Sequence, residues 1–463
     1  MRELGKKQKI DRSHYLFDNK ALTALIIPLI VEQLLAVLVG MADSIMVANV
    51  GEAAVSGVSL VDNIMVLLIN IFAALATGGA VVAGQYLGQK REKDACIAAK
   101  QLIWFIFLCS VGITAIVYLG RNFILHSVFG AIDADVMSSA NTYLMIVTAS
   151  IPLIALYNGG AAIFRAMGNS KVSMQVSIVM NVINVAGNAI LIYGFHRGTE
   201  GVAIPTLVSR MVAAILILGL LCNQTRVLHL EKTLRYHLNG SMVKRILNIG
   251  VPNGLENSMF QLGKILVLSL VSTFGTSAIA ANAVSNAVAL FQILPGMAIS
   301  LAVTTVISRC VGAGDYEQAK YYTRKLLKIT YCCMAVTVAL IFAVLPLIMK
   351  VYNLSAGTSA ESEKILLFHG CSAILVWPIA FNLPAVFRAS GDVRYSMITS
   401  IVSMWIFRIA FSYILGKYMG IGVFGVWIAM IIDWCFRAIL FVYRYFSRCP
   451  FFWDCSDYFG KCV

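Results

Sequence analysis

The chain contains two copies of one sequence unit. The segment PLIVEQ in the first half returns as PNGLEN in the second, and FRAMGNSK returns as FRASGDVR. Matching residues are separated by 224 or 223 positions: Glu32 and Glu256, Gly51 and Gly275, Gly88 and Gly312, and Phe164 and Phe387. Because the copies align almost without insertions, we expect two similar halves that face each other around a central site, rather than a solenoid.

The composition places both halves in a membrane. Of the 463 residues, 59% are hydrophobic and only 13% are charged, and the mean hydropathy is +0.83. Apolar runs of about twenty residues can cross a hydrocarbon core, and they lack the polar–apolar alternation of barrel strands. We therefore predict an all-α polytopic membrane protein with twelve spans, near 21–46, 57–85, 97–119, 139–163, 172–195, 201–222, 246–272, 279–308, 327–349, 366–387, 395–416 and 421–443.

The basic residues predict the topology. Of the 36 Lys and Arg residues, 28 fall in the tails and in loops on one side of the predicted membrane, five fall on the other side, and three lie within spans. The positive-inside rule then places both termini in the cytoplasm. Each half has an even number of spans, so both halves enter the membrane in the same orientation, related by a pseudo-twofold axis along its normal. Since most basic residues fall in the tails and in the loops between spans, the net charge of +14 does not indicate nucleic-acid binding.

These assignments divide the chain into five parts. The first span is too long and too acidic for a cleaved signal peptide, so we expect it to be retained. The predicted parts are a cytoplasmic tail (1–20), an N-terminal lobe of six spans (21–222), a cytoplasmic linker (223–245), a C-terminal lobe of six spans (246–445) and a second cytoplasmic tail (446–463).

Ionisable groups inside spans are costly, and each is a candidate functional residue. Glu32 and Glu256 occupy equivalent positions four residues after a proline, so we expect both to project into the space between the lobes and to exchange protons or cations. Alternatively, they stabilise the proline kinks or pair with neighbouring helices. Lys264 lies about two turns after Glu256. It is expected either to act as an internal counter-charge of Glu256 or to extend its charged end to the membrane interface.

A second candidate site lies in the N-terminal lobe. Asp43 follows Glu32 by about three turns, on nearly the same helix face. Asn181, Asn184 and Asn188 form a polar stripe on the fifth span, which should avoid lipid. The stripe and Asp43 could bind a cation or a proton. The alternative is hydrogen bonding between helices without an ion.

Other residues are expected to have structural roles or to line a cavity. The elements Arg165-Ala166-Met167-Gly168 and Arg388-Ala389-Ser390-Gly391 are expected to end helices at the cytoplasmic face, with each Arg near the helix dipole and the lipid headgroups. Asp433 and Arg437 are spaced as a structural i,i+4 pair. Besides Lys264, the residues that could line a substrate cavity are Gln33, Tyr157, Phe291, Trp377 and Asn382.

Enzymatic and cofactor chemistry are not expected. Histidine is scarce, most cysteines fall in or beside spans, and no spacing indicates a nucleophile with its base. We expect no cofactor and no metal beyond a transported Na⁺ near Asp43 or Glu256. The expected partners are a small-molecule substrate and membrane lipid, and the chain is expected to be a monomer.

The motifs MADSIMVANVGEAAVSGVSL, AAIFRAMGNSKVSM, PNGLENSMFQLG and FRASGDVRYSM resemble the multidrug and toxic compound extrusion (MATE) family, over nearly all of residues 20–445. The resemblance implies a V-shaped pair of six-helix lobes that exports organic, often cationic compounds against an inward flow of Na⁺ or H⁺. It places the first-helix aspartate of the family on Asp43, the seventh-helix glutamate of its NorM-like branch on Glu256, and the N-lobe polar cluster of its DinF-like branch on Asn184 and Asn188.

The chain departs from the family pattern at two places. Asn188 stands where members often have an aspartate, and the tenth span has His369 and Asn382 but no acid. The sequence therefore predicts an ion-coupled exporter of the plasma (inner) membrane and leaves Na⁺ or H⁺ open. A lipid-linked oligosaccharide flippase, or a channel or sensor without transport, are the alternatives.

Overall fold

A computed structural model describes residues 15–130, 132–230 and 237–447 of the chain. These residues are almost entirely helical and include no β-strand. The predicted tails lie largely outside the described residues. So do nine of the basic residues that contribute to the predicted topology: Arg2, Lys6, Lys7, Lys9, Arg12, Lys232, Arg235, Arg448 and Lys461.

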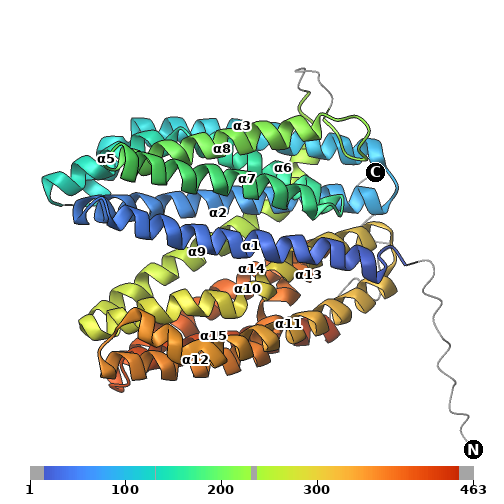
Figure 1. Ribbon diagram of the computed structural model, residues 1–463. Coiled ribbons are helices and arrows are strands. Elements are labelled where there is room, and N and C mark those ends of the chain that lie inside the picture. Colours follow the sequence, from blue (N-terminus) through green and yellow to red (C-terminus); the bar gives the residue numbers. More distant parts are fainter. Residues whose placement is uncertain (1–14, 131, 231–236, 448–463) are drawn as a thin grey trace, which may run out of the picture.

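The first half of the chain forms one bundle of helices (Figure 1). Its elements are α1 (Asn19–Ala48), α2 (Glu52–Gly88), α3 (Glu92–Leu119), α4 (Arg121–Phe123), the π-helical turn η1 (Ile124–Val128), α5 (Ala134–Thr148), α6 (Ile151–Ala166), α7 (Ser170–Ala189), the π-helical turn η2 (Ile190–Gly194) and α8 (Glu200–Leu221). Side-chain caps begin several helices of both halves. For example, Asp18 accepts a hydrogen bond from the Ala21 amide at the start of α1 (2.6 Å).

The second half repeats this arrangement in a second bundle. Its elements are α9 (Gly240–Ser272), α10 (Thr276–Gly312), α11 (Tyr316–Tyr352), α12 (Ala356–Trp377), η3 (Pro378–Asn382), α13 (Leu383–Ser390), α14 (Val393–Ser403), η4 (Met404–Ala410), η5 (Tyr413–Tyr418) and α15 (Val423–Ser447). We call the bundles the N-lobe and the C-lobe.

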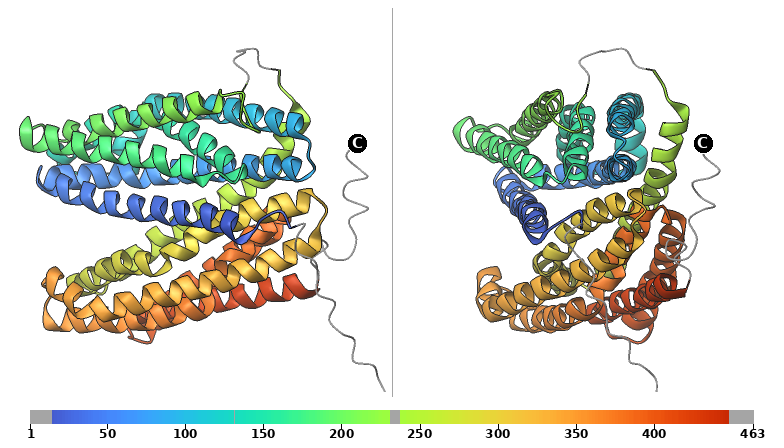
Figure 2. Two further views of the ribbon diagram at one scale, coloured as in Figure 1. Left: turned by 45° about the vertical axis from the view of Figure 1, so that its right-hand side comes forward. Right: turned by 90° about the vertical axis from the view of Figure 1, so that its right-hand side faces the viewer.

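The two lobes lie side by side and diverge along their length (Figures 1 and 2). They meet near the end where α1 begins and α15 ends, which we call the terminal end, and they splay apart toward the distal end. At their junction α2 packs against α9 and α10, and α1 packs against α10. The large apolar core of the N-lobe extends onto the start of α9, and a further apolar cluster joins α1 to α10 and α11, whereas another apolar core lies wholly within the C-lobe. The arrangement agrees with the predicted fold of two lobes.

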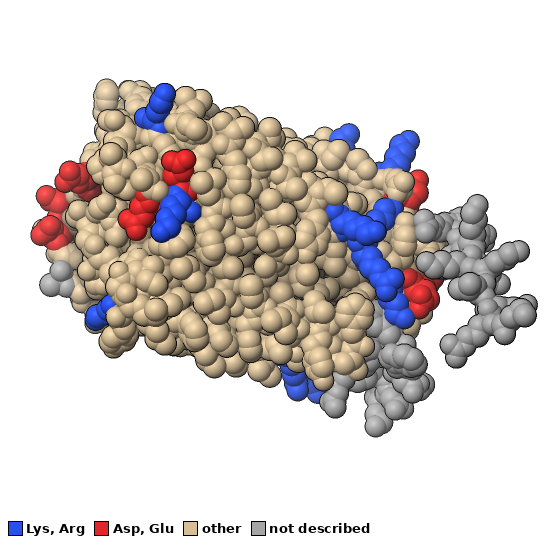
Figure 3. Space-filling view, turned by 90° about the horizontal axis from the view of Figure 1, so that it is seen from below, with Lys and Arg blue, Asp and Glu red and all other residues tan. Residues whose placement is uncertain are grey.

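Ten helices of the described residues are long and apolar enough to span a membrane, and the α5–α6 pair gives an eleventh. Figure 3 shows a broad middle band with few charged side chains, between charged groups near both ends. The seventh predicted span, α9, has 33 residues but is less apolar, because Glu256, Gln261 and Lys264 interrupt it. The prediction of a polytopic helical protein is confirmed.

Two predicted spans are less regular than expected. The span near 139–163 consists of α5 and α6, which meet at an angle of 47°. Pro152 stands in the first turn of α6, where its missing amide hydrogen costs no helical bond, but it prevents α5 from continuing straight through. The span near 366–387 is divided by η3, which begins at Pro378.

Glycines let the lobes approach at the terminal end. A Cβ atom added to Gly88 of α2 would lie 2.1 Å from the Arg309 carbonyl oxygen of α10. One added to Gly312 would lie 2.0 Å from the Gln85 carbonyl oxygen. Gly88 and Gly312 are equivalent in the sequence repeat, so each half presents the same glycine to the other half. The pseudo-twofold axis therefore passes close to this contact.

Hydrogen bonds across the lobes repeat the same symmetry. The Gln85 side-chain amide donates to the Ala389 carbonyl at the end of α13 (3.1 Å). The Arg309 guanidinium donates to the Ala166 carbonyl at the end of α6 (3.0 Å). Gln85 and Arg309 are equivalent in the repeat, and so are Ala166 and Ala389. Two symmetry-related bonds therefore connect the lobes at their terminal ends.

Candidate functional site

The N-lobe holds a buried polar network around Asp43 of α1. Asn188 of α7 donates from its amide nitrogen to the Asp43 carboxylate (2.8 Å), and its amide oxygen is buried without a partner among the described residues. Asn184, one turn earlier, also reaches Asp43. Spacings of four residues place both amides on one face of α7, which packs against α1.

The Asn184 amide fits two orientations. With its oxygen accepting from the Thr206 hydroxyl (3.1 Å), its nitrogen donates to both Asp43 oxygens (2.9 and 3.2 Å). In the reverse orientation its nitrogen donates to Thr206 (3.1 Å), and its oxygen faces the carboxylate. Two oxygens in contact are favourable only when a proton or a cation is shared between them. With an ionised Asp43, the first orientation is therefore the one that satisfies both side chains.

A second carboxylate stands close to the first. Asp62 of α2 accepts a hydrogen bond from the Tyr143 hydroxyl of α5 (3.0 Å). Arg210 of α8 donates to the Ser150 hydroxyl at the α5–α6 bend (2.8 Å) and acts electrostatically on both Asp62 and Asp43. Two carboxylates therefore face one guanidinium in the N-lobe interior. When both acids are ionised, this network lacks one positive charge.

The sequence predicted part of this network. The expected proximity of Asp43, Asn184 and Asn188 is present, whereas Asn181 hydrogen-bonds Ser177 (3.5 Å) on its own helix. The roles of Asp62 and Arg210 were missed. Both were recognisable as charged residues in apolar spans, but nothing in one sequence indicates that α2, α5 and α8 bring them together.

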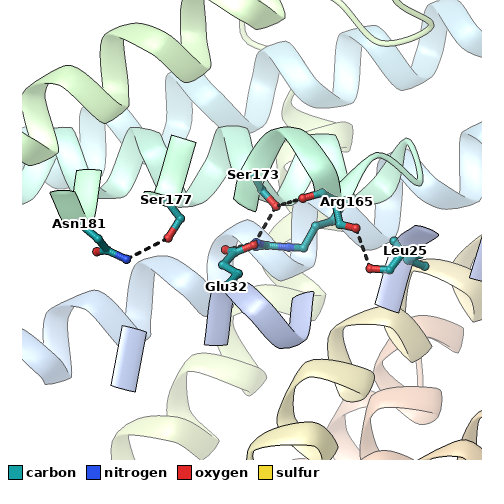
Figure 4. Close-up of polar contacts among 7 residues, drawn as sticks. Leu25, Glu32, Arg165, Ser173, Ser177 and Asn181 are labelled. Carbon is teal, nitrogen blue, oxygen red and sulfur yellow. Dashed lines mark hydrogen bonds and ion pairs between the residues drawn. The ribbon is translucent and has the colours of Figure 1, made fainter. Parts of the chain in front are cut away.

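The repeated glutamates do not project between the lobes as expected. Glu32 pairs with Arg165 of α6 (3.4 Å) and accepts from the Ser173 hydroxyl of α7 (2.8 Å). Figure 4 shows these groups converging, with Ser177 and Asn181 farther along α7. Arg165 thus lies against a buried carboxylate, which corrects the expectation that it meets lipid headgroups.

The second repeat has the same triad of a glutamate, an arginine and a serine, which Glu32, Arg165 and Ser173 form in the first. Glu256 pairs with Arg388 (3.6 Å) and accepts from Ser396 (3.4 Å). Arg388 is therefore not a headgroup contact either, and the counter-charge of Glu256 is Arg388 rather than Lys264. The glycines that follow both arginines do end their helices, with positive φ angles at Gly168 (77°) and Gly391 (96°).

The predicted cavity residues are mostly inside the lobes. Trp377 is buried and stacks on Phe381 (4.9 Å between centroids). Asn382 donates to the Thr330 hydroxyl (2.9 Å). Tyr157 is also buried, Phe291 packs against the C-lobe core, and Gln33 is half-buried. Packing within a lobe therefore accounts for Tyr157, Phe291, Trp377 and Asn382.

The predicted Asp433–Arg437 pair is present (2.9 Å).

Comparison with known proteins identifies the family. The profile of the MatE family matches residues 28–190 and again residues 252–414, so its two matches have the same spacing as the sequence repeat. The chain belongs to the MatE family. Among the described residues of this MatE protein, no group of three His, Cys, Asp or Glu side chains could hold a metal ion.

Curated relatives cover nearly the whole chain. The MatE protein is 28% identical to the uncharacterized transporter YisQ of Bacillus subtilis, over 91% of this chain and 92% of the relative. It is 25% identical to the probable multidrug resistance protein NorM of Thermotoga maritima, over 91% of each chain.

Solved structures share the fold. An outward-facing conformation of a MATE family multidrug resistance transporter superposes with a TM-score of 0.86 at 22% identity, covering 92% of this chain and 94% of that one. A transporter from Pyrococcus furiosus, described as having a binding pocket of reverse polarity, superposes with a TM-score of 0.84 at 22% identity, covering 91% and 94%. The two-lobe fold of the MatE protein is thus the fold of known transporters.

Proposed function

We propose that this protein is a secondary antiporter of the cell membrane that exports small organic molecules, including drugs, in exchange for inward movement of Na⁺ or H⁺. Membership of the MatE family and the curated multidrug resistance relatives support export. The observation that carries the coupling is the contact of Asp43 with Asn184 and Asn188.

The N-lobe network has the chemistry of a cation or proton site. The Asp43 carboxylate, the unpartnered Asn188 amide oxygen and the Asn184 oxygen in one orientation are oxygen ligands of the kind that hard cations prefer. A protonated Asp43 would instead donate a hydrogen bond to the Asn184 oxygen. Either event neutralises the carboxylate and rotates the Asn184 amide, which changes how α1 is held against α7.

The orientation of the lobes fits alternating access. The positive-inside rule puts the terminal end in the cytoplasm, so the Gln85 and Arg309 bonds would close the cytoplasmic side. The lobes diverge at the distal end, which would face outward (Figure 2). Binding of the cation to the N-lobe would bias the equilibrium between this arrangement and an inward-facing one.

Everted membrane vesicles test the proposal. Fluorescein, or a cationic rhodamine that has the same xanthene ring, is added to the medium, which faces the cytoplasmic side of everted vesicles containing the full chain. A Na⁺ gradient or a pH gradient directed out of the lumen is imposed, and accumulation of dye in the lumen is measured. We expect one gradient to drive dye movement, and Asp43→Asn to abolish it. Glu200→Gln is the matched control, because Glu200 is an exposed acid of the same lobe whose ion pair among the described residues is with exposed Arg197 (3.7 Å). Wild-type vesicles that move neither dye under either gradient would contradict the proposal.

A further inference from the structure

The C-lobe interior has the opposite charge balance to the N-lobe. Its spans carry Lys264 on α9, Arg408 on η4 and Arg437 on α15, besides the Glu256–Arg388 pair. The remaining acid of these spans in the described residues is Asp433. Three cations therefore face one carboxylate, where the N-lobe network has two carboxylates and one guanidinium.

Among the described residues, Asp433 forms its ion pair with Arg437 and not with Lys264 or Arg408. Both side chains of this pair are almost fully buried. Arg437 donates to Asp433 (2.9 Å) and to the Ser400 carbonyl (3.1 Å), and Ser403 also donates to Asp433 (2.5 Å). The pair on α15 is thus hydrogen-bonded to α14 and stabilises the contact between these two helices. Lys264 and Arg408 are left as two positive charges that have no ion pair with any described residue.

Lys264 and Arg408 both lie near Phe260, whose ring is 5.9 Å from the Arg408 guanidinium and which precedes Lys264 by one helical turn. The two cations repel each other, while Arg408 is attracted by Asp433 and repelled by Arg437. Two unpaired cations in a membrane-spanning region cost several kcal/mol on most scales unless an anion joins them. The Nε atom of Arg408 is buried and has no partner in the described part of the chain. The arrangement therefore favours an anionic ligand beside these side chains.

Lys264 is turned toward the N-lobe. Gly250 marks the side of α9 that faces α2, because a Cβ atom added there would lie 3.0 Å from Leu75 Cα. Lys264 follows Gly250 by close to four helical turns, so their directions differ by only about 40°. Its side chain is nevertheless exposed, since the lobes have diverged at this depth. A molecule between the lobes can reach it.

An aromatic ring lies next to these cations. Phe260 precedes Lys264 by one turn of α9, and its ring lies 5.9 Å from the Arg408 guanidinium and 4.4 Å from that of Arg437. Phe260 meets the ring of Phe381 edge to face (6.3 Å). Half-buried aromatic side chains beside cations suit a ligand that combines a flat ring with an acidic group.

From these observations we infer that the C-lobe face formed by Lys264, Arg408 and Phe260 binds the acidic group and ring of an aromatic organic anion, which is the exported substrate. The inference rests on the proposed function and assigns its substrate class. It departs from the cationic compounds that the family resemblance suggested. The coupling cation and the substrate would occupy different lobes, each beside groups of opposite charge.

Equilibrium binding tests the inference independently of transport. Fluorescein anisotropy is measured with the purified full chain in neutral detergent. We expect Lys264→Gln and Arg408→Gln each to weaken binding about ten-fold or more, because each removes a charge-assisted contact. Lys264→Arg and Arg408→Lys should retain most of the affinity. Lys417→Gln, which removes an exposed lysine of η5, is the matched control and should bind as the wild type does.

Two comparisons decide between ligands. The cationic rhodamine should bind more weakly than fluorescein, and its binding should not fall in the Gln variants. Binding of fluorescein should also persist when phosphatidylglycerol is added to the micelles. Complete displacement by that lipid would assign the cations to lipid headgroups and overturn the inference. Equal loss of both dyes in the Gln variants, or no effect of either variant, would overturn it as well.

Transport then separates this inference from the proposed function. Charge-dependent binding of fluorescein without gradient-driven movement would leave the anion site intact and contradict the antiporter. Gradient-driven export of rhodamine alone, unaffected by Lys264→Gln, would support the antiporter and contradict the anion site.

Discussion

Glu32 and Arg165 form an ion pair (3.4 Å) that connects α1 to α6, and the second repeat rebuilds it from Glu256 and Arg388 (3.6 Å). Both pairs are largely buried, and a serine hydroxyl donates to each carboxylate. The duplication therefore preserved a way of fixing the first helix of each lobe to its fourth and fifth spans. The two glutamates therefore have a structural role, and Asp43 is the remaining candidate for coupling to a cation.

Breaking the N-lobe pair should destabilise the protein. Arg165→Gln leaves Glu32 buried without its counter-charge, and we expect a loss of about 3 kcal/mol. The exposed Arg197–Glu200 pair (3.7 Å) is the control, and Arg197→Gln should cost less than about 1 kcal/mol. Thermal unfolding in detergent measures both. Equal midpoints for the two variants would show that the Glu32–Arg165 pair does not hold the lobe together.

The two triads should differ in their serines. Ser173 approaches Glu32 to 2.8 Å, whereas Ser396 lies 3.4 Å from Glu256. Since hydrogen bonds to charged groups contribute about 1.5–3 kcal/mol, Ser173→Ala should lower stability by that amount and Ser396→Ala by less. The same unfolding assay compares them. A larger loss in Ser396→Ala would contradict the geometry described for the triads.

The polar stripe of α7 should divide into coupling and structural residues. Asn188→Leu removes a donor to Asp43 (2.8 Å), so cation-driven export should fall at least ten-fold. Asn181→Leu is the matched control, because Asn181 bonds Ser177 and not Asp43. Initial rates of dye uptake into everted vesicles, which correspond to export from the cell, measure the effect. Similar losses in both variants would mean that the stripe acts only through packing.

The glycine contact between the lobes should tolerate no side chain. Gly312→Ala would put a Cβ atom 2.0 Å from the Gln85 carbonyl oxygen, so the lobes must move apart at the terminal end. We expect a loss of about 3 kcal/mol in unfolding free energy, at the upper end of overpacking effects. Gly112→Ala meets nothing within 4 Å and should be neutral or slightly stabilising. A neutral Gly312→Ala would contradict the close approach of α2 and α10.

The sequence predicted the architecture better than the site. The repeat and the apolar runs are properties of the whole chain, so the helical lobes followed from them. Asp43 was linked correctly to Asn184 and Asn188, though not to Asn181, because these asparagines share one helix face and are costly in lipid. The partners of Glu32 and Glu256 were not predicted, because Arg165 and Arg388 lie more than 130 residues away along the chain. Both arginines also stand near helix ends, where arginines that contact lipid headgroups are common as well.

Four of the predicted cavity residues, Tyr157, Phe291, Trp377 and Asn382, are packed within a lobe, and the sequence did not indicate this for a related reason. Aromatic and amide side chains occur both in packed interiors and in binding sites, and composition does not separate the two. Trp377 and Asn382 are buried inside the C-lobe, where they contact Phe381 and Thr330. The orientation of Lys264 toward the other lobe depends on how α9 packs against α2, which no local pattern in α9 indicates.

Substrate-dependent cation uptake tests the central claim most directly. Proteoliposomes are loaded with an exported dye, and inward Na⁺ and H⁺ fluxes are recorded on the same sample for the wild type, Asp43→Asn and Glu200→Gln. We predict that dye efflux from the wild type and from Glu200→Gln is accompanied by inward flux of one of the two cations, and that Asp43→Asn shows neither movement. Cation-coupled dye efflux of wild-type magnitude in Asp43→Asn would contradict the account.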